Sequence, residues 1–371
     1  MKIASYNVEN LFDRAKAFND DTPEARRVIK LQAKLNELFQ KPVYETSDKL
    51  RILEIMEETG LLKTNNATYI LLRKIRGKLI KRPLSGNDYE IVANGRADWV
   101  GWAELKMAPV NEVAVMNTGR VLRDVNADIL AVVEAENRIA LKQFSDYVLT
   151  QIDGKPYRNV MLIDGNDERG IDVGLMTKNG FDIGLMRSHI NDPDSEGLPV
   201  YSRDCPEYCV RTPEGEDIWI LPNHFKSKFG GNDPAAQNMR QNQAIRTAEI
   251  YNRLISDGFP NVAVLGDLND TPDSMPIQKL LLGTDLQDVS THPSFDTGTF
   301  PGNGTFGLGN DSDKIDYILL SPALYGRVTA SGLFRKGAWP GSRPVRWEVY
   351  HELKKPIHAA SDHHLLWCEL R

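Results

Sequence analysis

The stretch Val262-Ala263-Val264-Leu265-Gly266-Asp267-Leu268-Asn269-Asp270-Thr271-Pro272 combines a buried-type strand with a polar turn. Four apolar residues in succession are typical of a strand that is covered on both faces, and Gly266 marks its end. Asp267 and Asn269 follow two positions apart, so both side chains can face a nucleophile or a developing oxyanion. The alternative is an Asx turn that closes the strand, because Asp and Asn favour such turns.

Two other strand ends carry residues suited to metal binding and proton transfer. Residues 127–133 form an apolar strand that ends in Glu134, a hard-oxygen ligand of the kind that Mg²⁺ prefers. Asp362 and His363 precede the last strand, and a neutral histidine is the natural general base near pH 7. The alternatives are a solvent-facing charge for Glu134 and a surface-loop residue for His363. We interpret His364 as structural or solvent-exposed.

Asp316 and His224 are the remaining polar residues associated with apolar strands. Asp316 interrupts the strand 315–320, where an unpaired buried carboxylate would be unfavourable. We therefore expect it to pair with His363, to fix the tautomer of the ring and to stabilise the imidazolium. His224 follows the strand 217–223, and its neighbours include the hydrogen-bond donors Asn223, Lys226 and Ser227.

Short apolar segments dominate the chain beyond residue 130 and predict a strand-based domain. Strands are expected at 159–163, 171–176, 208–211, 217–223, 261–265, 315–320 and 364–370. Several gaps between them are too short for a crossover helix, so the mixed α/β layout should contain mainly antiparallel pairs. Helices are predicted at 24–39, 48–58, about 110–125 and about 237–257.

Residues 15–114 are interpreted as a mainly helical insertion within a single domain that spans residues 1–371, because no flexible linker bounds them. An apolar segment within the insertion becomes strongly basic over residues 73–82. Its basic residues are Arg73, Lys74, Arg76, Lys78, Lys81 and Arg82. One hypothesis is a substrate-binding cap that grips phosphates with this stretch. The other is a solvated or structural helical face, which is the usual role of a charge run.

Composition limits the class of protein without identifying a substrate. The chain has 371 residues and a net charge of −6, which argues against tight, non-specific DNA binding through phosphate contacts. No apolar run reaches the length of about 18 residues typical of a membrane helix, and the amino terminus lacks signal-peptide features. We therefore expect a cytoplasmic protein with no obligate protein partner. Cys205, Cys209 and Cys368 are expected to be free thiols, the alternative being a Cys205–Cys209 disulfide or a zinc site.

In their order along the chain, these segments resemble the endonuclease/exonuclease/phosphatase superfamily, which includes deoxyribonuclease I-like enzymes. The resemblance covers residues 1–14 and 115–371. It rests on the segments ASYNVENLF, DILAVVEAE, RGIDVGLMTK, NHFKSK, VLGDLND, DKIDYILLS and ASDHH. The resemblance implies a four-layer α/β sandwich, in which two mostly antiparallel sheets are flanked by helices. Residues 15–114 have no assigned counterpart in the family.

The resemblance also implies roles for individual residues around a Mg²⁺ ion, or a Mn²⁺ ion in its place. Glu134 resembles the principal metal ligand. Three residues are expected close to the metal or its waters, and these are Asn7, Glu9 and Asp362. His363 is similar to the general base or phosphate contact of the family, oriented by Asp316.

The remaining implied roles concern the nucleophile and the substrate. Asp267 and Asn269 resemble the pair that positions the nucleophile and stabilises the pentacovalent transition state. His224 is similar to the second histidine of the deoxyribonuclease-like members, with Asp172 as its carboxylate partner. Two residues are expected to contact substrate phosphate, and these are Arg203 and Asn223.

Three functions remain open from the sequence. The first is a nuclease or phosphodiesterase that hydrolyses P–O bonds of nucleic acid by attack of an activated water molecule. The second is a phosphatase or phosphodiesterase on a small or lipid substrate, such as an inositol phosphate or sphingomyelin. The third is an inactive binding module, which the complete set of competent site residues disfavours.

Overall fold

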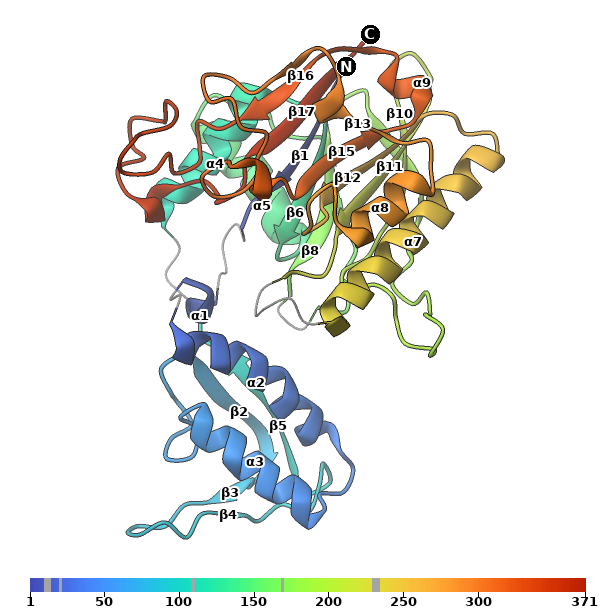
Figure 1. The fold of residues 1–371 in the computed structure, drawn as a ribbon. Helices are drawn as coiled ribbons and strands as arrows, with labels where there is room; N and C mark the ends of the chain where they lie inside the picture. The colour runs from blue at the N-terminus through green and yellow to red at the C-terminus, as the bar shows by residue number, and fades with distance from the viewer. Residues whose placement is uncertain (10–14, 20–21, 108–110, 168–169, 229–233) are drawn as a thin grey trace. The chain divides into compact units, whose positions relative to one another are not determined.

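The computed structural model describes residues 1–9, 15–19, 22–107, 111–167, 170–228 and 234–371. The last three residues of ASYNVENLF and Arg169 of RGIDVGLMTK lie outside these ranges. The chain divides into two compact units, one made of Met1–Phe12 with Asn111–Arg371 and the other of Asp13–Val110 (Figure 1). None of the described helices combines the length and the hydrophobicity that a membrane span requires.

Two mixed sheets form the framework of the larger unit. The first has the strand order β14 (Phe295–Asp296), β16 (Val328–Phe334), β17 (Leu365–Leu370), β1 (Lys2–Asn7), β6 (Ile129–Ala135), β8 (Asp172–Thr177), β7 (Asn159–Leu162). The second has the order β13 (Gln287–Asp288), β15 (Asp316–Leu320), β12 (Val262–Asp267), β11 (Asp217–His224), β10 (Glu207–Arg211), β9 (Asp182–Arg187). Neighbouring strands are antiparallel except in the pairs β1–β6, β11–β12 and β14–β16.

Strand alternation divides the apolar side chains of this unit into three layers. One core lies between the sheets and contains Ile3, Ile220 and Leu265. A second core joins the outer face of the first sheet to α4 (Glu112–Val125), α5 (Arg138–Gln143), η1 (Phe144–Val148) and α6 (Leu149–Gln151). A third joins the second sheet to α7 (Pro234–Ser256) and α8 (Met275–Leu282), which cover that sheet in Figure 1. The remaining short helices are η2 (Val289–Thr291), η3 (Asp311–Asp313), α9 (Pro322–Tyr325) and η4 (Pro356–His358).

The larger unit is therefore a four-layer α/β sandwich of two mostly antiparallel sheets, and the predicted fold is confirmed. The predicted helices at about 110–125 and 237–257 correspond to α4 and α7. Asn111 caps α4 by accepting hydrogen bonds from the N–H groups of Val113 and Ala114, and Asn126 ends it in the left-handed conformation.

The smaller unit has its own apolar core and contains both helices and strands. Its helices are α1 (Lys16–Asn19), α2 (Pro23–Gln40) and α3 (Thr46–Glu58), and the predictions at 24–39 and 48–58 agree with the last two. Its strand pairs are β2 (Ile70–Gly77) with β5 (Trp99–Leu105), and β3 (Ile80–Lys81) with β4 (Glu90–Ile91). The basic stretch 73–82 thus lies on β2 and β3 rather than on a helix.

Side chains of α2 occupy the backbone groups of β5 in this unit. Gln32 Nε2 donates to the carbonyl oxygen of Ala103 at 2.9 Å, and the Ala103 N–H donates to Asn36 Oδ1 at 2.7 Å. Thr22 caps the amino terminus of α2 by accepting from the N–H of Ala25. These contacts satisfy backbone groups that an exposed strand edge would leave unpaired.

Gly266 allows β11 and β12 to approach closely at the end that bears Asp267. Its φ is 133°, and a Cβ added there would lie 2.0 Å from the carbonyl oxygen of Asn223. Gly266→Ala should therefore lower the free energy of unfolding by at least about 2 kcal/mol, through backbone strain and overpacking together. Urea unfolding followed by tryptophan fluorescence measures the loss.

Gly258→Ala is the matched control, because Gly258 also has a positive φ, 91°, but no atom lies within 4 Å of an added Cβ. The control should lose less stability, since only backbone strain acts there. Equal losses in the two variants would show that the contact with Asn223 is not the cause.

Candidate active site

Strand alternation places four polar side chains at one end of the space between the sheets. Asn7 ends β1, His224 ends β11, Asp267 ends β12 and Asp316 begins β15. On each strand these residues share the phase of side chains that point into the inter-sheet core, because side chains alternate with a period of two. The core residues in the same phase are Ile3, Ile220, Leu265 and Ile318.

Glu134 reaches the same region through an irregularity of β6. Regular alternation would place it with Leu130 and Val132, which pack on the helix side. Its φ is instead +64°, and the register with β8 shifts between Val133 and Ala135. As a result Glu134 Oε1 lies 3.6 Å from His224 Nε2. Bulges next to active sites re-aim side chains in this way.

Backbone strain is concentrated in this region. Among the described residues, the non-glycine positions with positive φ are Glu9, Asn126, Glu134, Asp153 and Asn269. Three of these five, Glu9, Glu134 and Asn269, belong to the predicted site. Such conformations persist where the surrounding structure imposes them, and they cluster at functional sites.

His363 and Asp316 form the predicted pair. Nδ1 of His363 lies 2.8 Å from Oδ2 of Asp316, and since a carboxylate accepts, Nδ1 carries the proton. Thr305 Oγ1 donates to the same carboxylate oxygen at 2.7 Å. Burial opposes protonation of the imidazole, but the charges of Asp316 and Asp267 raise the pKa of His363 well above its usual value.

Asp267 lies between the two histidines. Its Oδ2 is 3.8 Å from Nε2 of His363 and 3.7 Å from Nε2 of His224, and it accepts a hydrogen bond from Asn7 Nδ2 at 3.2 Å. Burial, followed by the negative charge of Asp316, raises the pKa of the Asp267 carboxyl well above its usual range. The structure therefore brings Asn7, Glu134, His224, Asp267 and His363 together around one point.

Hydrogen bonds hold Asn269, Glu9 and Asp362 beside this group. The Asn269 N–H donates to Asp267 Oδ1 at 2.9 Å, and its Nδ2 donates to the carbonyl oxygen of Phe225 at 3.1 Å. The Glu9 N–H donates to Asn7 Oδ1 at 3.0 Å, while Glu9 Oε2 accepts from the N–H of Asp362 at 3.1 Å. Glu9 thereby connects the end of β1 to the segment that carries His363.

Asp172 and Arg203 lie together on either side of Gly165. A Cβ added to Gly165 would be 2.7 Å from Asp172 Oδ1 and 2.9 Å from the Cα of Arg203. Asp172 accepts from the Gly165 N–H at 2.8 Å, and mainly burial raises its pKa to about 7. Arg203 is buried and forms an ion pair with Asp167 at 2.8 Å.

Asn223 does not face this cluster. It is fully buried, its Nδ2 donates to the Leu221 carbonyl at 3.0 Å, and its Oδ1 accepts from Thr247 Oγ1 of α7 at 3.3 Å. Adjacent residues of a strand point to opposite faces, so Asn223 and His224 cannot both face the inter-sheet space. The phase of β11 assigns that place to His224.

Three residues that position the site were not among the sequence predictions. Thr305 accepts from the N–H groups of Ile315 and Asp316 while it donates to the Asp316 carboxylate. Ser361 Oγ accepts from the His363 N–H at 2.9 Å. Asp270 forms an ion pair with the buried Arg240 at 3.1 Å beneath the turn that follows β12. The buried carboxylate Asp316 was a signal that donors besides His363 were needed.

The donor set suits a divalent cation. Asp267, Asp316 and His363 each offer a ligand atom within 4.8 Å of the others, so this buried group could hold a metal ion. Because Nδ1 of His363 is bonded to Asp316, a cation would find its oxygen donors on the side of Asp267 and Glu134. The negative charges of Asp316 and Glu134 both raise the pKa of Asp267, and a cation would relieve this crowding.

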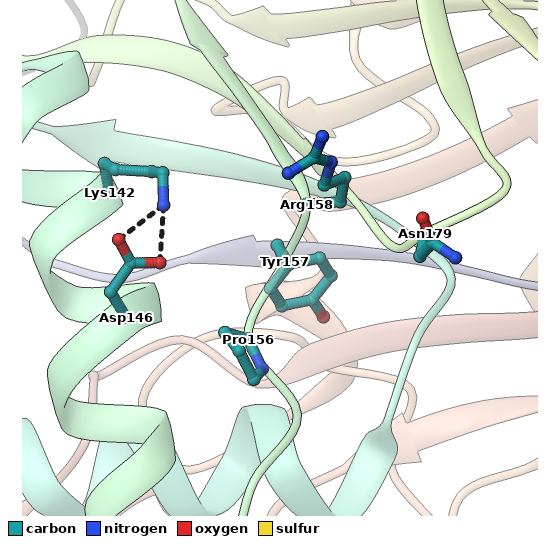
Figure 2. Close-up of a pocket in the computed structure, with 6 residues that line it drawn as sticks. All are labelled: Lys142, Asp146, Pro156, Tyr157, Arg158 and Asn179. Atoms are coloured by element: carbon teal, nitrogen blue, oxygen red, sulfur yellow. Dashed lines mark hydrogen bonds and ion pairs between the residues drawn. The ribbon is translucent and has the colours of Figure 1, made fainter.

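A separate pocket of about 430 Å³ lies at the opposite end of the first sheet. Figure 2 shows its lining residues, which are Lys142, Asp146, Pro156, Tyr157, Arg158 and Asn179. Asn159 of β7 pairs with Thr177 at that end of β8, whereas Asp172 begins β8 at the site end. The Lys142 ammonium is paired with Asp146 (Figure 2). None of the clustered site residues lines this pocket.

The model of the endonuclease/exonuclease/phosphatase family matches residues 81–331 of this chain. The match covers more than half of the sequence, so the chain belongs to that family and is a phosphoesterase of this class. It stops short of β1 and His363, and their place in the site therefore rests on the geometry above.

Two solved structures share the fold at low sequence identity. A mannosyl-6-phosphatase from Bacteroides thetaiotaomicron is 16% identical, with a TM-score of 0.51 over 70% of this chain and 90% of its own. An endonuclease/exonuclease/phosphatase family protein from the same organism is also 16% identical, with a TM-score of 0.51 over 70% of this chain and 85% of its own. No curated protein matches the sequence.

His364 supports the loop that carries His363 from inside the protein. Its N–H donates to the Thr305 carbonyl at 2.7 Å, its Nε2 lies 3.2 Å from the Gly307 carbonyl oxygen, and its ring packs edge-on against Trp347. The structural interpretation of this histidine thus holds. Burial, and after it the charge of Arg335, lowers the pKa of His364 to about 3.

This pKa predicts a loss of stability in acid. An unfolded histidine titrates near 6.5, so below that pH the unfolded chain binds a proton that the folded His364 resists until about pH 3. His364→Gln keeps a donor for Gly307 but does not titrate. Between about pH 6 and pH 4 the wild-type protein should lose stability more steeply than this variant, as measured by urea midpoints. Parallel profiles would contradict the assignment.

Proposed function

We propose that this phosphoesterase is a divalent-cation-dependent phosphodiesterase, with Mg²⁺ as the expected ion, that hydrolyses P–O bonds of nucleic acid. The observation that carries the proposal is the position of Asp267 between His363 and His224, with His363 bonded on its other side to Asp316. A second histidine facing the reaction centre is the feature that resembles deoxyribonuclease-like enzymes.

His363 is proposed to activate the attacking water. Its Nδ1–H is donated to Asp316, so Nε2 is the atom that takes the proton. Asp316 then stabilises the imidazolium and, held by Thr305, prevents the ring from turning. Asp267 and Asn269 position the water, since the Asn269 N–H fixes one oxygen of Asp267 and leaves the other facing the histidines.

Glu134 and Asp267 would hold the cation, with Asn7, Glu9 and Asp362 beside it or its waters. When bound, the cation offsets these carboxylates and polarises a phosphate oxygen. His224 is proposed to donate to a phosphate oxygen as negative charge develops, with Asp172 in a supporting position. Arg203 is proposed to face substrate phosphate, whereas Asn223 is left out because its side chain points toward α7.

A small phosphate ester is the second candidate substrate. Outside residues 13–110 the chain has 27 Lys and Arg against 37 Asp and Glu, a net charge of −10. An acidic catalytic unit gives a polyanion no general attraction, and this favours a compact substrate such as an inositol phosphate.

A substrate panel separates the two candidates. Plasmid, single-stranded DNA, RNA, abasic duplex, bis-p-nitrophenyl phosphate, inositol phosphates and sphingomyelin are each incubated with Mg²⁺, Mn²⁺ or EDTA. The proposal expects cleavage of nucleic acid with a divalent cation and none in EDTA. Cleavage of inositol phosphates or sphingomyelin alone would favour the second candidate. No cleavage of any ester would leave an inactive binding module.

Two substitutions test the assigned chemistry. His363→Ala and Asp267→Ala should each lower kcat at least about 100-fold, because general acid–base catalysis and nucleophile positioning are lost. His351→Ala is the control, since His351 is an exposed histidine outside the site and its loss should leave the rate unchanged. Turnover by either site variant at the level of the control would refute the assignment.

A further inference from the structure

Charge is distributed unevenly between the two units of the chain. Residues 13–110 contain 18 Lys and Arg against 14 Asp and Glu, a net charge of +4, while the rest of the chain carries −10. Within the smaller unit the excess is local, because residues 69–87 contain six basic residues and no acidic one. The positive charge therefore belongs to β2, β3 and the segment between them.

The contacts of the basic residues divide them into two groups. Arg82 is structural, since its guanidinium donates to the carbonyl oxygens of Leu61 and Leu62 at 3.0 and 2.8 Å. The other group consists of exposed lysines with no ion pair or hydrogen bond to any described residue. These are Lys74, Lys78 and Lys81. Ammonium groups without a protein partner are available to an anionic ligand.

An aromatic side chain lies on the exposed face of the same strand pair. Trp102 is 40% exposed and stands directly opposite Arg73 on the neighbouring strand. Arg76 stands opposite Val100, two positions from Trp102, so Arg76 and Trp102 share one face. The indole is anchored, because its Nε1–H donates to Glu104 Oε2 at 3.3 Å and Arg73 holds that carboxylate with two hydrogen bonds.

We infer that this basic surface (Lys74, Arg76, Lys78, Lys81 and Trp102) binds a single strand of nucleic acid. Lysine contacts to phosphate supply affinity that is independent of sequence, and an exposed indole stacks on an unpaired base. A duplex offers the phosphates but keeps its bases stacked on each other, so the tryptophan selects a single strand. The inference rests on the proposed function, because it identifies the form of nucleic acid that the phosphodiesterase takes.

The test measures binding by the full-length protein in EDTA, where cleavage is suppressed. Fluorescence anisotropy with a labelled oligothymidylate of about 20 nucleotides gives Kd over a range of salt concentrations. The triple variant Lys74→Ala, Lys78→Ala, Lys81→Ala should bind at least about tenfold more weakly. The slope of log K against log salt should fall by about 2, since each phosphate contact on a single strand contributes about 0.7.

A matched control removes the same charge from elsewhere in the unit. Arg27, Lys30 and Lys34 are exposed on α2, and the triple variant Arg27→Ala, Lys30→Ala, Lys34→Ala should keep the wild-type Kd within about threefold, with the salt slope nearly unchanged. Equal weakening in the two triple variants would overturn the inference, because only net charge would then matter.

Trp102 supplies an independent measurement. Trp102→Ala should weaken binding of the single strand at least about fivefold, the loss expected for one stacked base, and leave binding of a matched duplex unchanged. Trp102→Tyr should restore most of the affinity, because tyrosine also stacks. Unchanged binding of the single strand by Trp102→Ala would overturn the stacking contact and, with it, the choice of a single strand.

Ester hydrolysis and vesicle binding distinguish a nucleic-acid surface from a catalytic defect and from a membrane contact. Hydrolysis of bis-p-nitrophenyl phosphate should be the same in wild type and in all basic-surface variants, because a small ester does not need the surface. Loss of all ester hydrolysis in wild type would refute the proposed function, whereas active protein that binds no single strand refutes only this inference. If the lysine variant loses binding to phosphatidylserine vesicles but binds oligothymidylate normally, the surface is a membrane contact and the inference is wrong.

Discussion

Repulsion between two buried carboxylates is the constraint around which the site is built. Asp267 and Asp316 stand directly opposite each other on the antiparallel strands β12 and β15, and both are buried. Like charges in this arrangement are destabilising, and burial makes them more so. Every neighbouring group that the structure places there reduces this repulsion. His363 and Thr305 donate to Asp316, while Asn7 and the Asn269 N–H donate to Asp267.

Compensation by neutral donors is incomplete, which connects the electrostatics to the chemistry. The pKa of Asp267 stays raised, first by burial and then by Asp316, and Glu134 adds a third negative charge. A divalent cation on the side of Glu134 is the remaining means of balancing the set. The same cation would reduce the negative charge that raises the pKa of His363, and so favour the neutral imidazole that a general base requires. Strain at Glu134 and at Asn269 is a further stability cost that the surrounding sandwich has to offset.

The sequence predicted the residues that strand alternation and burial determine. Asp316 and His363 could be paired because a carboxylate within an apolar strand requires a donor. Asn223 shows the limit of listing polar residues at a strand end. It precedes His224, and the period of two allows only one of them to face the site. Phase relative to Ile220 would have decided between them, since Ile220 belongs to the inter-sheet core.

Other features could not be predicted because they depend on contacts between distant segments. Thr305 lies in a loop without periodicity, and its role follows only from the approach of that loop to Asp316. Glu134 has the wrong phase for the site, and its position depends on the bulge opposite β8. The strand β2 was overlooked because its exposed half, Arg73–Gly77, has no apolar alternation. Its partner β5 lies more than twenty residues later in the chain.

The distribution of charge suggests why one chain contains both units. A site that concentrates carboxylates to hold a cation makes its surroundings acidic, and here that unit carries −10. Such surroundings repel a polyphosphate until the cation is bound, and they offer little attraction beyond it. Lysines near the site would strengthen substrate binding but would also compete with the cation for Asp267 and Glu134. Placing the positive charge on a separately folded unit avoids that competition, because the lysines on β2 and β3 attract phosphate without altering the pKa values of the catalytic carboxylates.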